Sequence, residues 1–277
     1  MPVSMGRLIR GCGLALALSV TAPFAAEKVV HVAGVYFPPY VFKADEQLQK
    51  VGLLADLLDE LNQQQAAFRF VMVPTSINRR FGDFRQGRID LAIFENPDWG
   101  WQEIAHSAVD MGLEDSEVFV SRAEPGRDQH YFERLEGKRL ALYHGYHYAF
   151  ADFNAEPKYL IARFKATLTH SHDSNLLMVL RGRADIALVT RSYIGDFLER
   201  YREYAGQLLI SERIDQHYRH HVLLRPGAPI SAEQISEMLE TLRRNGRLAE
   251  IFGRYQVRVV PAAADTSLSA GPGASGS

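Results

Sequence analysis

Two hydrophobic patterns alternate along this chain. Short apolar runs rich in β-branched residues are separated by longer segments in which apolar residues recur every three to four positions. The short runs predict strands, and the longer segments predict helices. Their alternation is typical of βαβ units, so we expect an α/β fold with mainly parallel sheets. The predicted strands are residues 29–35, 68–73, 89–94, 139–143, 161–166, 186–189 and 221–224.

The clearest helical pattern lies at residues 53–61, where leucines occupy one face and acidic residues the other. Near the other end of the chain, Ser231 and Gln234 have the spacing of a capping box, which begins a helix. The pair Asn245 and Gly246 is typical of a helix end. Further helices are expected at residues 78–85, 148–154 and 174–180.

A short phrase occurs twice, as QGRIDLAIF at residues 86–94 and as RGRADIALV at residues 181–189. In each copy a glycine, Gly87 or Gly182, is placed to end a helix in the left-handed conformation, and an Asp then precedes an apolar strand. Each copy therefore predicts a helix-to-strand joint. Such joints also recur by chance in α/β proteins, but here the same order of strand, helix, strand and helix precedes both. We therefore expect two similar α/β lobes.

Ligands of open parallel sheets bind outside the carboxyl ends of the strands, where helix N-termini expose unpaired N–H groups. Two facing lobes would line a shared cleft with the residues that follow the two joints. These residues are Phe94, Glu95 and Asn96 in the first lobe and Thr190, Arg191 and Ser192 in the second.

Residues 1–26 have the pattern of a secretory signal peptide. Arg7 and Arg10 precede an apolar run at residues 11–20, and the small-residue end APFAA follows. The apolar run is too short to span a membrane as a permanent helix. We expect cleavage after Ala26 and export to a bacterial periplasm; a buried N-terminal helix is the alternative.

Composition narrows the function classes further. Hydrophobic residues make up 47% of the 277 residues and charged residues 23%, which is the balance of a globular protein. Cys12 is the single cysteine and would leave with the signal peptide, so thiol catalysis and thiolate metal sites are not expected. The loss of Arg7 and Arg10 takes the basic count from 31 to 29, against 33 acidic residues, which does not favour nucleic acid as a partner.

An ordered series of short motifs resembles the bacterial extracellular solute-binding proteins of family 3, the polar amino-acid type with the type II periplasmic-binding fold. The resemblance covers residues 29–255. YFPPYVF, VGLLADLLDELNQ, FRQGRIDLAI and EIAHSAVD are similar to successive parts of the family's first lobe. LEGKRLALYHGYHY and LRGRADIALV are similar to the opening and the joint of its second lobe, and ISEMLETLRRNGRLAEIFGRY to its closing helices.

This resemblance implies two doubly wound α/β lobes joined by a two-strand hinge, which lets the lobes close without unfolding either core. The expected crossings lie near residues 118–126 and 219–224. The expected divisions are residues 27–121 with 222–257 for lobe 1, 122–221 for lobe 2, and 258–277 for a disordered, small and polar tail. The implied protein is a monomer without a cofactor. It captures a small polar solute, such as an amino acid or a related organic acid or amine, for an inner-membrane permease of the ABC type.

The chain departs from the amino-acid binders it resembles at two places. They hold the ligand carboxylate with an Arg just before the segment matched by EIAHS, where this chain has NPDWGWQ with Gly100 or a neighbouring Trp. They hold the ligand amino group with an Asp after the second joint, where this chain has Thr190 and Arg191. The resemblance therefore leaves the identity of the ligand open.

Arginines near the predicted cleft favour an anionic ligand group. Arg191 and one of Arg79 and Arg80 could contribute, because a guanidinium offers two parallel donors to a carboxylate or phosphate. Glu95 could pair with a ligand cation or hold Arg79 in place.

Aromatic residues could form a box around a planar or cationic ligand group. The candidates are Phe37, Trp99 and Trp101, unless one of the two tryptophans packs in the core. The complete predicted ligand-binding set is Phe37, Arg79, Glu95, Asn96, Trp99, Trp101, Tyr146, His147, Thr190 and Arg191.

Metal binding, catalysis and sensing are the alternatives to solute transport. The second-lobe histidines could ligate a metal, but no carboxylate or Cys spacing completes a metal site, so none is predicted. A dehydratase that acts on cyclohexadienyl acids would need an acid or base such as Glu95, Asp98 or His147, and no nucleophile motif occurs. A sensor that hands its ligand-bound form to a membrane receptor needs the same cleft as a transporter subunit. The second-lobe histidines considered as metal ligands are His144, His147, His170, His172, His217, His220 and His221.

Overall fold

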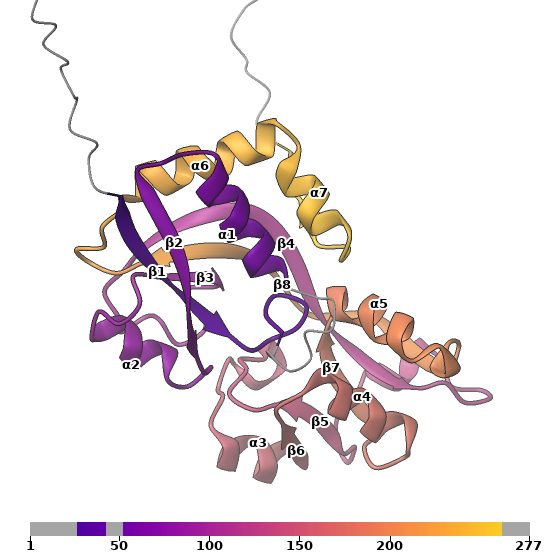
Figure 1. Cartoon of the computed structure of the whole chain (residues 1–277). Helices are drawn as coiled ribbons and strands as arrows, with labels where there is room; N and C mark the ends of the chain where they lie inside the picture. Colours follow the sequence, from indigo (N-terminus) through magenta and orange to yellow (C-terminus); the bar gives the residue numbers. More distant parts are fainter. Residues whose placement is uncertain (1–26, 43–51, 262–277) are drawn as a thin grey trace, which may run out of the picture.

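The computed structural model describes residues 27–42 and 52–261. The expected signal peptide at residues 1–26 lies outside the described residues, and so do residues 262–277 of the expected tail. The described chain forms two α/β lobes, one above the other in Figure 1, which two long strands connect. This arrangement confirms the predicted fold class.

In the first lobe, β1 (Lys28–Val35) lies between β2 (Phe68–Thr75) and β3 (Leu91–Glu95) and is parallel to both. Helix α1 (Leu53–Gln63) buries all five of its leucines against this sheet, as its hydrophobic stripe predicts. Helix α2 (Arg80–Arg85) connects β2 to β3 and leads into the first copy of the repeated phrase.

The second lobe repeats this pattern. Strand β5 (Leu140–Tyr143) lies between β6 (Ala166–Thr169) and β7 (Ile186–Thr190), again parallel to both. The helices of this lobe are α3 (Pro157–Phe164), α4 (His172–Leu180) and α5 (Arg191–Arg200). Short 3-10 turns occur at Gln129–Phe132, Ala149–Ala151 and Arg202–Tyr204.

Strands β4 (Ser107–Arg122) and β8 (Leu208–Leu224) are antiparallel to each other and run through both lobes. They join the two parallel sheets into one continuous sheet with the strand order β2-β1-β3-β8-β4-β7-β5-β6. The chain then returns to the first lobe through α6 (Ala232–Arg244), α7 (Arg247–Gly253) and β9 (Arg258–Val259).

Several predicted elements differ from the structure. Residues 161–166 were expected to form a strand, but most of them belong to α3, which begins at Pro157 and leaves Ile161 52% exposed. Residues 148–154 form only the short turn Ala149–Ala151. The predicted strand at 221–224 is the end of the 17-residue β8. Arg258 and Val259 were placed in the tail but form β9, which pairs with β4.

The crossing of β4 between the lobes lies at residues 110–117, earlier than the expected 118–126. β4 pairs with the first-lobe end of β8 as far as Asp110, and it pairs with β7 from Glu117 onward. The β8 crossing, at residues 216–221, overlaps the expected 219–224. Residues 114–117 of β4 are polar although three of them are buried, so no apolar pattern marks the place where this strand crosses between the lobes.

The two copies of the repeated phrase form the predicted joints. Gly87 and Gly182 have φ angles of 72° and 67°, in the left-handed region that glycine adopts without strain. After each glycine an Asp binds the neighbouring strand through both backbone and side chain. The Asp90 N–H donates to the carbonyl of His31 at 2.7 Å, and Asp90 Oδ2 accepts from the His31 N–H at 2.8 Å. Asp185 makes the matching pair with Arg139, at 2.8 Å and 2.7 Å.

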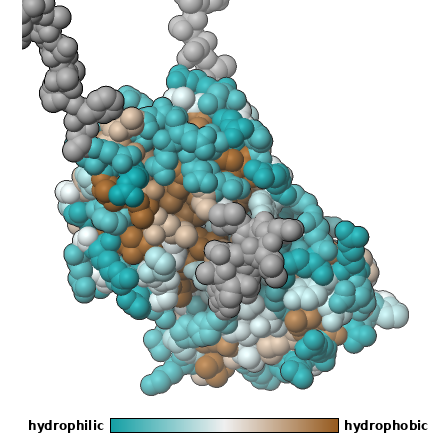
Figure 2. Space-filling model, in the orientation of Figure 1, coloured by the Kyte–Doolittle hydropathy of each residue, from teal (hydrophilic) through white to brown (hydrophobic). Residues whose placement is uncertain are grey.

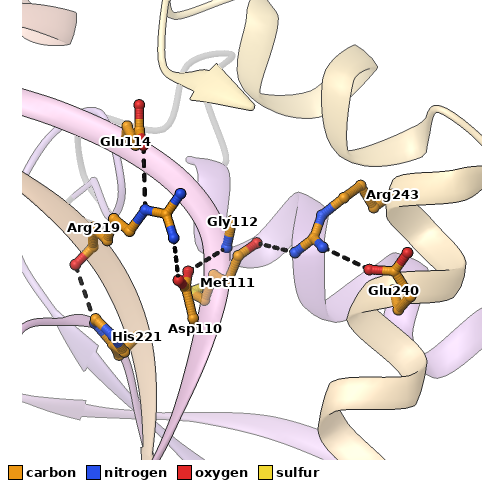
Figure 3. Close-up of polar contacts among 8 residues, drawn as sticks. All are labelled: Asp110, Met111, Gly112, Glu114, Arg219, His221, Glu240 and Arg243. Carbon is orange, nitrogen blue, oxygen red and sulfur yellow. Dashed lines mark hydrogen bonds and ion pairs between the residues drawn. The ribbon is translucent and has the colours of Figure 1, made fainter. Parts of the chain in front are cut away.

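A polar network holds β4 where it leaves the first lobe (Figure 3). Gly112 has a φ angle of 63°, and its N–H donates to Asp110 Oδ1 at 2.7 Å. Arg219 of β8 donates to Asp110 Oδ2 at 2.8 Å and to Glu114 Oε1 at 3.2 Å. Arg243 of α6 donates to the carbonyl that precedes Gly112 at 3.1 Å. The register of β4 against β8 shifts between Asp110 and Glu114, and this network ties β8 and α6 to that β-bulge.

The lobes share apolar contacts as well as strands. One hydrophobic cluster includes Trp99 and Trp101 of the first lobe together with Leu142 and Tyr146 of the second. On the face shown in Figure 2, hydrophobic surface gathers on the first lobe and reaches the junction with the second. None of the helices in the described part of the chain is long and apolar enough to cross a membrane.

Candidate functional site

A cavity lies between the two lobes and encloses about 670 Å³, part of it open to solvent. Its walls come from β1, the loop after it, α1, α2, β3 and the loop after β3 in the first lobe, and from the loop after β5 in the second. Strand β8 supplies the remaining wall. The lining residues are Ala33, Val35, Phe37, Tyr40, Val41, Leu54, Ile77, Arg80, Ile93, Phe94, Glu95, Trp99, Tyr146, His147, Tyr218 and His220.

Phe37 joins the two lobes at this cavity. Its ring stacks on that of Tyr146, with 5.5 Å between centroids and 11° between planes, and meets the edge of His172 at 4.8 Å. A tight loop presents it, because the Phe37 N–H donates to the carbonyl of Val41 and the Val41 N–H donates back. The same loop places Tyr40 on the cavity wall.

A β-bulge positions another ring of the wall. The register of β3 against β8 shifts between Ile93 and Glu95, and Phe94 there has a φ angle of 64°. This conformation is unusual for a bulky residue, and bulges commonly redirect a side chain next to a site. The Phe94 ring lies 4.8 Å from that of Tyr40 and 5.6 Å from that of His220.

Arg80 and Glu95 form an ion pair on the cavity wall. Arg80 Nε lies 2.5 Å from Glu95 Oε1, and Arg80 Nη2 donates to Glu95 Oε2 at 3.3 Å. Trp101 Nε1 donates to the same Oε2 at 2.9 Å. Glu95 therefore cancels the charge of the guanidinium that lines the cavity.

Tyr40 and His220, which line the cavity, form a hydrogen-bonded cluster with Asp115 behind the wall. The Tyr40 hydroxyl donates to Asp115 Oδ2 at 2.7 Å and lies 2.8 Å from His220 Nε2. Burial raises the pKa of Asp115, because a carboxylate removed from water loses its hydration. Burial also lowers the pKa of His220 to about 3, so the imidazole is neutral near pH 7.

A second buried carboxyl, Glu117, lies at the hinge two residues after Asp115 on β4. It is fully buried, and Thr190 Oγ1 donates to its Oε2 at 3.1 Å. Burial, followed by the neighbouring Asp115, raises the pKa of Glu117 well above its ordinary value. No described basic residue forms an ion pair with either carboxyl.

His147, from the second lobe, is the second histidine among the described residues that line the cavity. Burial, and then the charge of Arg80, lower its pKa to about 4. Its carbonyl accepts a hydrogen bond from Gln216 Nε2 at 2.7 Å, which ties the second-lobe loop to β8. In the described ranges, no three His, Cys, Asp or Glu residues are arranged to hold a metal ion.

The structure brings half of the predicted ligand-binding residues together. Phe37, Glu95, Trp99, Tyr146 and His147 all line the cavity. The guanidinium on the wall belongs to Arg80, whereas Arg79 is exposed.

The other predicted residues lie outside the lining. Trp101 is fully buried in the core, with its ring 4.8 Å from Phe81, which agrees with the alternative that one tryptophan packs inside. Thr190 is buried against Glu117, and exposed Arg191 donates to Ser116 at 3.3 Å. Asn96 accepts from the backbone N–H of Asp98.

Sequence reasoning missed the contribution of β8 to the site. Gln216, Tyr218 and His220 alternate along this strand, and Tyr218 and His220 reach the cavity, while Gln216 accepts from Trp99 Nε1 at 3.2 Å. In the sequence QHYRHH at residues 216–221, every second side chain of a strand would point to the same face, and this alternation could have indicated that β8 reaches the site. It was overlooked because the predicted strand began only at His221.

Solved structures with this arrangement are numerous, although no family model and no curated protein matches the sequence. The substrate-binding protein of an ABC uptake transporter from Streptococcus pneumoniae, with bound histidine, is 19% identical. The match has a TM-score of 0.67 and covers 85% of this chain and 95% of the neighbour's chain.

Two further neighbours share the same fold. The periplasmic VFT2 domain of BvgS from Bordetella pertussis is 22% identical, with a TM-score of 0.59, and covers 82% of this chain and 93% of its own. An ancestral amino-acid-binding protein, a precursor of cyclohexadienyl dehydratase, is 15% identical, with a TM-score of 0.60, and covers 82% of this chain and 94% of its own. At these identities the likeness establishes the architecture: the chain has the two-lobed fold of the type II periplasmic binding proteins.

Proposed function

We propose that this protein is a periplasmic binding protein, which captures a small solute between its two lobes and presents it to an ABC-type transporter. The observation that carries the proposal is the composition of the cavity wall. Side chains of the first lobe, the second lobe and the hinge strand β8 all contribute, so a bound solute would contact every part that moves when the lobes close.

Close contacts between the lobes around the cavity support this proposal. A Cβ atom added to Gly145 of the second lobe would lie 2.8 Å from Asn78 of the first, and one added to Gly100 would lie 3.2 Å from His147. Tyr143 also donates across the junction to the carbonyl of Tyr36 at 3.1 Å. The described lobes therefore meet at the rim of the cavity, as expected of a closed cleft.

A thermal-shift screen of amino acids, organic acids, amines and uncharged aromatic solutes tests the proposal. A solute at 100 times its dissociation constant adds about 2.7 kcal/mol to the free energy of unfolding, which raises Tm measurably. Tyr146→Ala should abolish the shift, because it removes a cavity wall. The control variant Tyr204→Ala alters an aromatic cluster outside the cavity and should keep it. The absence of any Tm shift, or an equal shift in both variants, would contradict the proposal.

Two alternatives have support from the structural neighbours. The likeness to the BvgS domain favours a ligand-sensing partner of a membrane receptor. Uptake of the identified solute by cells lacking this protein separates the two roles, because only a transporter subunit is needed for uptake. The likeness to a dehydratase precursor keeps a cyclohexadienyl-dehydratase-like activity as the other alternative. Chromatography of the solutes after incubation with the protein would detect a product.

A further inference from the structure

The charges around the cavity do not suit a ligand carboxylate. Among the described lining residues, Arg80 carries the single guanidinium, and Glu95 already pairs with it. The two lining histidines, His147 and His220, are neutral near pH 7 because they are buried. Arg191, which the sequence placed in an anion site, is exposed and outside the lining.

Aromatic faces dominate the same wall. Phe37, Tyr40, Phe94 and Trp99 contribute rings from the first lobe, and Tyr146 and Tyr218 face them from the second lobe and β8. The ring faces carry partial negative charge and attract an organic cation that has left water. A ligand in the cavity that packs against these rings would therefore gain both apolar burial and cation–π attraction.

Two buried carboxyls behind the wall form no ion pair with any basic side chain in the described ranges. Asp115 is held by Tyr40, whose ring lines the cavity, and Glu117 by Thr190. Glu117 also interacts with the lining residue Tyr146: burial and then Glu117 raise the pKa of the Tyr146 hydroxyl, and a hydrogen bond from Tyr146 opposes the rise in the pKa of Glu117. Burial raises the pKa of both carboxyls because the ionised form is costly there, and a positive charge nearby in the low-dielectric interior would favour that ionised form.

We propose that the solute is an organic cation, an amine or quaternary ammonium with an apolar or aromatic body and no carboxylate. Its charged group lies against the aromatic faces on the Tyr40 side of the cavity, near Asp115 and Glu117. This inference rests on the proposed solute-binding function and replaces the anionic ligand that the sequence favoured. A free amino acid is a poorer fit, because the one arginine among the described lining residues, Arg80, is already paired with Glu95 and cannot balance a ligand carboxylate.

Calorimetric titration with four probes tests the charge preference. The probes are benzyltrimethylammonium and choline as cations, 3,3-dimethylbutan-1-ol as the uncharged isostere of choline, and L-phenylalanine as an aromatic zwitterion. We expect choline to bind at least ten times more tightly than its isostere, and benzyltrimethylammonium more tightly than phenylalanine by a similar factor. Equal affinities for choline and the isostere, or tighter binding of phenylalanine, would overturn the inference.

Charge-removing variants connect the preference to the hinge carboxyls. Glu117→Gln and Asp115→Asn should each weaken binding of benzyltrimethylammonium about tenfold and leave the uncharged isostere unchanged. The matched control is Glu114→Gln on the same strand, whose carboxylate is paired with Arg219 and Arg258 near the surface, and which should keep full affinity. A reversible thermal transition in each variant shows that it is folded. Unchanged cation affinity in folded Glu117→Gln and Asp115→Asn would show that the two carboxyls do not contribute to binding of the cation.

The outcomes separate this inference from the proposed function. An anionic or uncharged solute that binds, and that loses its affinity in Tyr146→Ala, would keep the binding function and refute the cationic ligand. The absence of binding by every class of solute would refute both.

Discussion

His172 is a titratable side chain enclosed by aromatic rings. It is 1% exposed, neither ring nitrogen has a hydrogen-bond partner among the described residues, and the rings of Phe37, Tyr143 and Tyr193 surround it. Burial lowers its pKa to about 3, whereas an unfolded histidine titrates near 6.5. The histidine is therefore neutral in the folded protein and becomes protonated on unfolding at acidic pH. Its contribution to stability is present above pH 6.5 and is lost as the pH falls toward 3.

We expect His172→Phe to make the protein less sensitive to acid. Between pH 8 and pH 5 the wild-type protein should lose about 2 kcal/mol of unfolding free energy through this one group, and the variant should not. Urea unfolding at both pH values measures the difference. His130→Gln, which alters a histidine whose side chain is 82% exposed, serves as the control and should behave like the wild type. An identical pH dependence in His172→Phe and the wild type would contradict the assignment.

At the scale of elements, the two helix-to-strand joints use the same backbone pattern in different surroundings. The Asp90 side chain is 4% exposed and pairs with Arg225 at 2.7 Å, whereas the Asp185 side chain is 28% exposed and pairs with the half-exposed Arg139. A buried charge that loses its partner is far more costly than a solvated one.

Asp90→Asn should therefore destabilise the protein by about 3 kcal/mol. Asp185→Asn, the same change in the other copy, should cost about 1 kcal/mol or less. Denaturant unfolding of both variants measures these costs in one experiment. Equal costs would show that burial does not distinguish the two joints.

The bulge in β4 gives a second prediction at this scale. An added Cβ at Gly112 would lie 2.7 Å from Arg243 Cζ, and the residue has a positive φ angle. Gly112→Ala should cost about 1 kcal/mol for the left-handed backbone and a further amount because Arg243 is displaced from its carbonyl acceptor. Gly137→Ala is the matched control, since Gly137 has a φ angle of 79° and nothing within 4 Å of an added Cβ. Thermal unfolding should show Gly112→Ala as the less stable variant, and the reverse order would contradict the role of Arg243.

At the scale of the whole molecule, Phe37 holds the two lobes together across the cavity. Its ring contacts Tyr143, Tyr146 and His172, all in the second lobe. Phe37→Ala removes these contacts and should shift the protein toward a more open arrangement. Small-angle X-ray scattering should then give a larger radius of gyration than for the wild type. Ile161→Ala, at an exposed position of α3, is the control and should leave the scattering unchanged. Indistinguishable curves for Phe37→Ala and the wild type would show that Phe37 does not hold the lobes together.

Most of the fold could be predicted because its signals are local. The leucine stripe of α1, the capping box of Ser231 and the glycines of the two joints each depend on residues close together in the sequence. The prediction failed at residues 161–166, where an apolar run alone does not distinguish a strand from an amphipathic helix, and Pro157 was not recognised as a helix start.

The site was less predictable than the fold, because it depends on pairs distant in the sequence. Whether Arg79 or Arg80 reaches the cavity depends on the orientation of α2 relative to β3, which brings Glu95 to Arg80. The contact between Tyr40 and His220 spans 180 positions, and no local pattern indicates it.

The sequence by itself determined the alternation of strands and helices, the two equivalent lobes and the joints, because backbone conformation and amphipathic period follow from neighbouring residues. Tertiary structure alone decided the chemistry of the cavity. Folding paired Arg80 with Glu95, buried Asp115 and Glu117 behind the cavity wall, and made two lining histidines neutral. The physical reason is that the charge of a side chain in a binding site depends on its distance from other charges and from water, and the folded chain sets both distances.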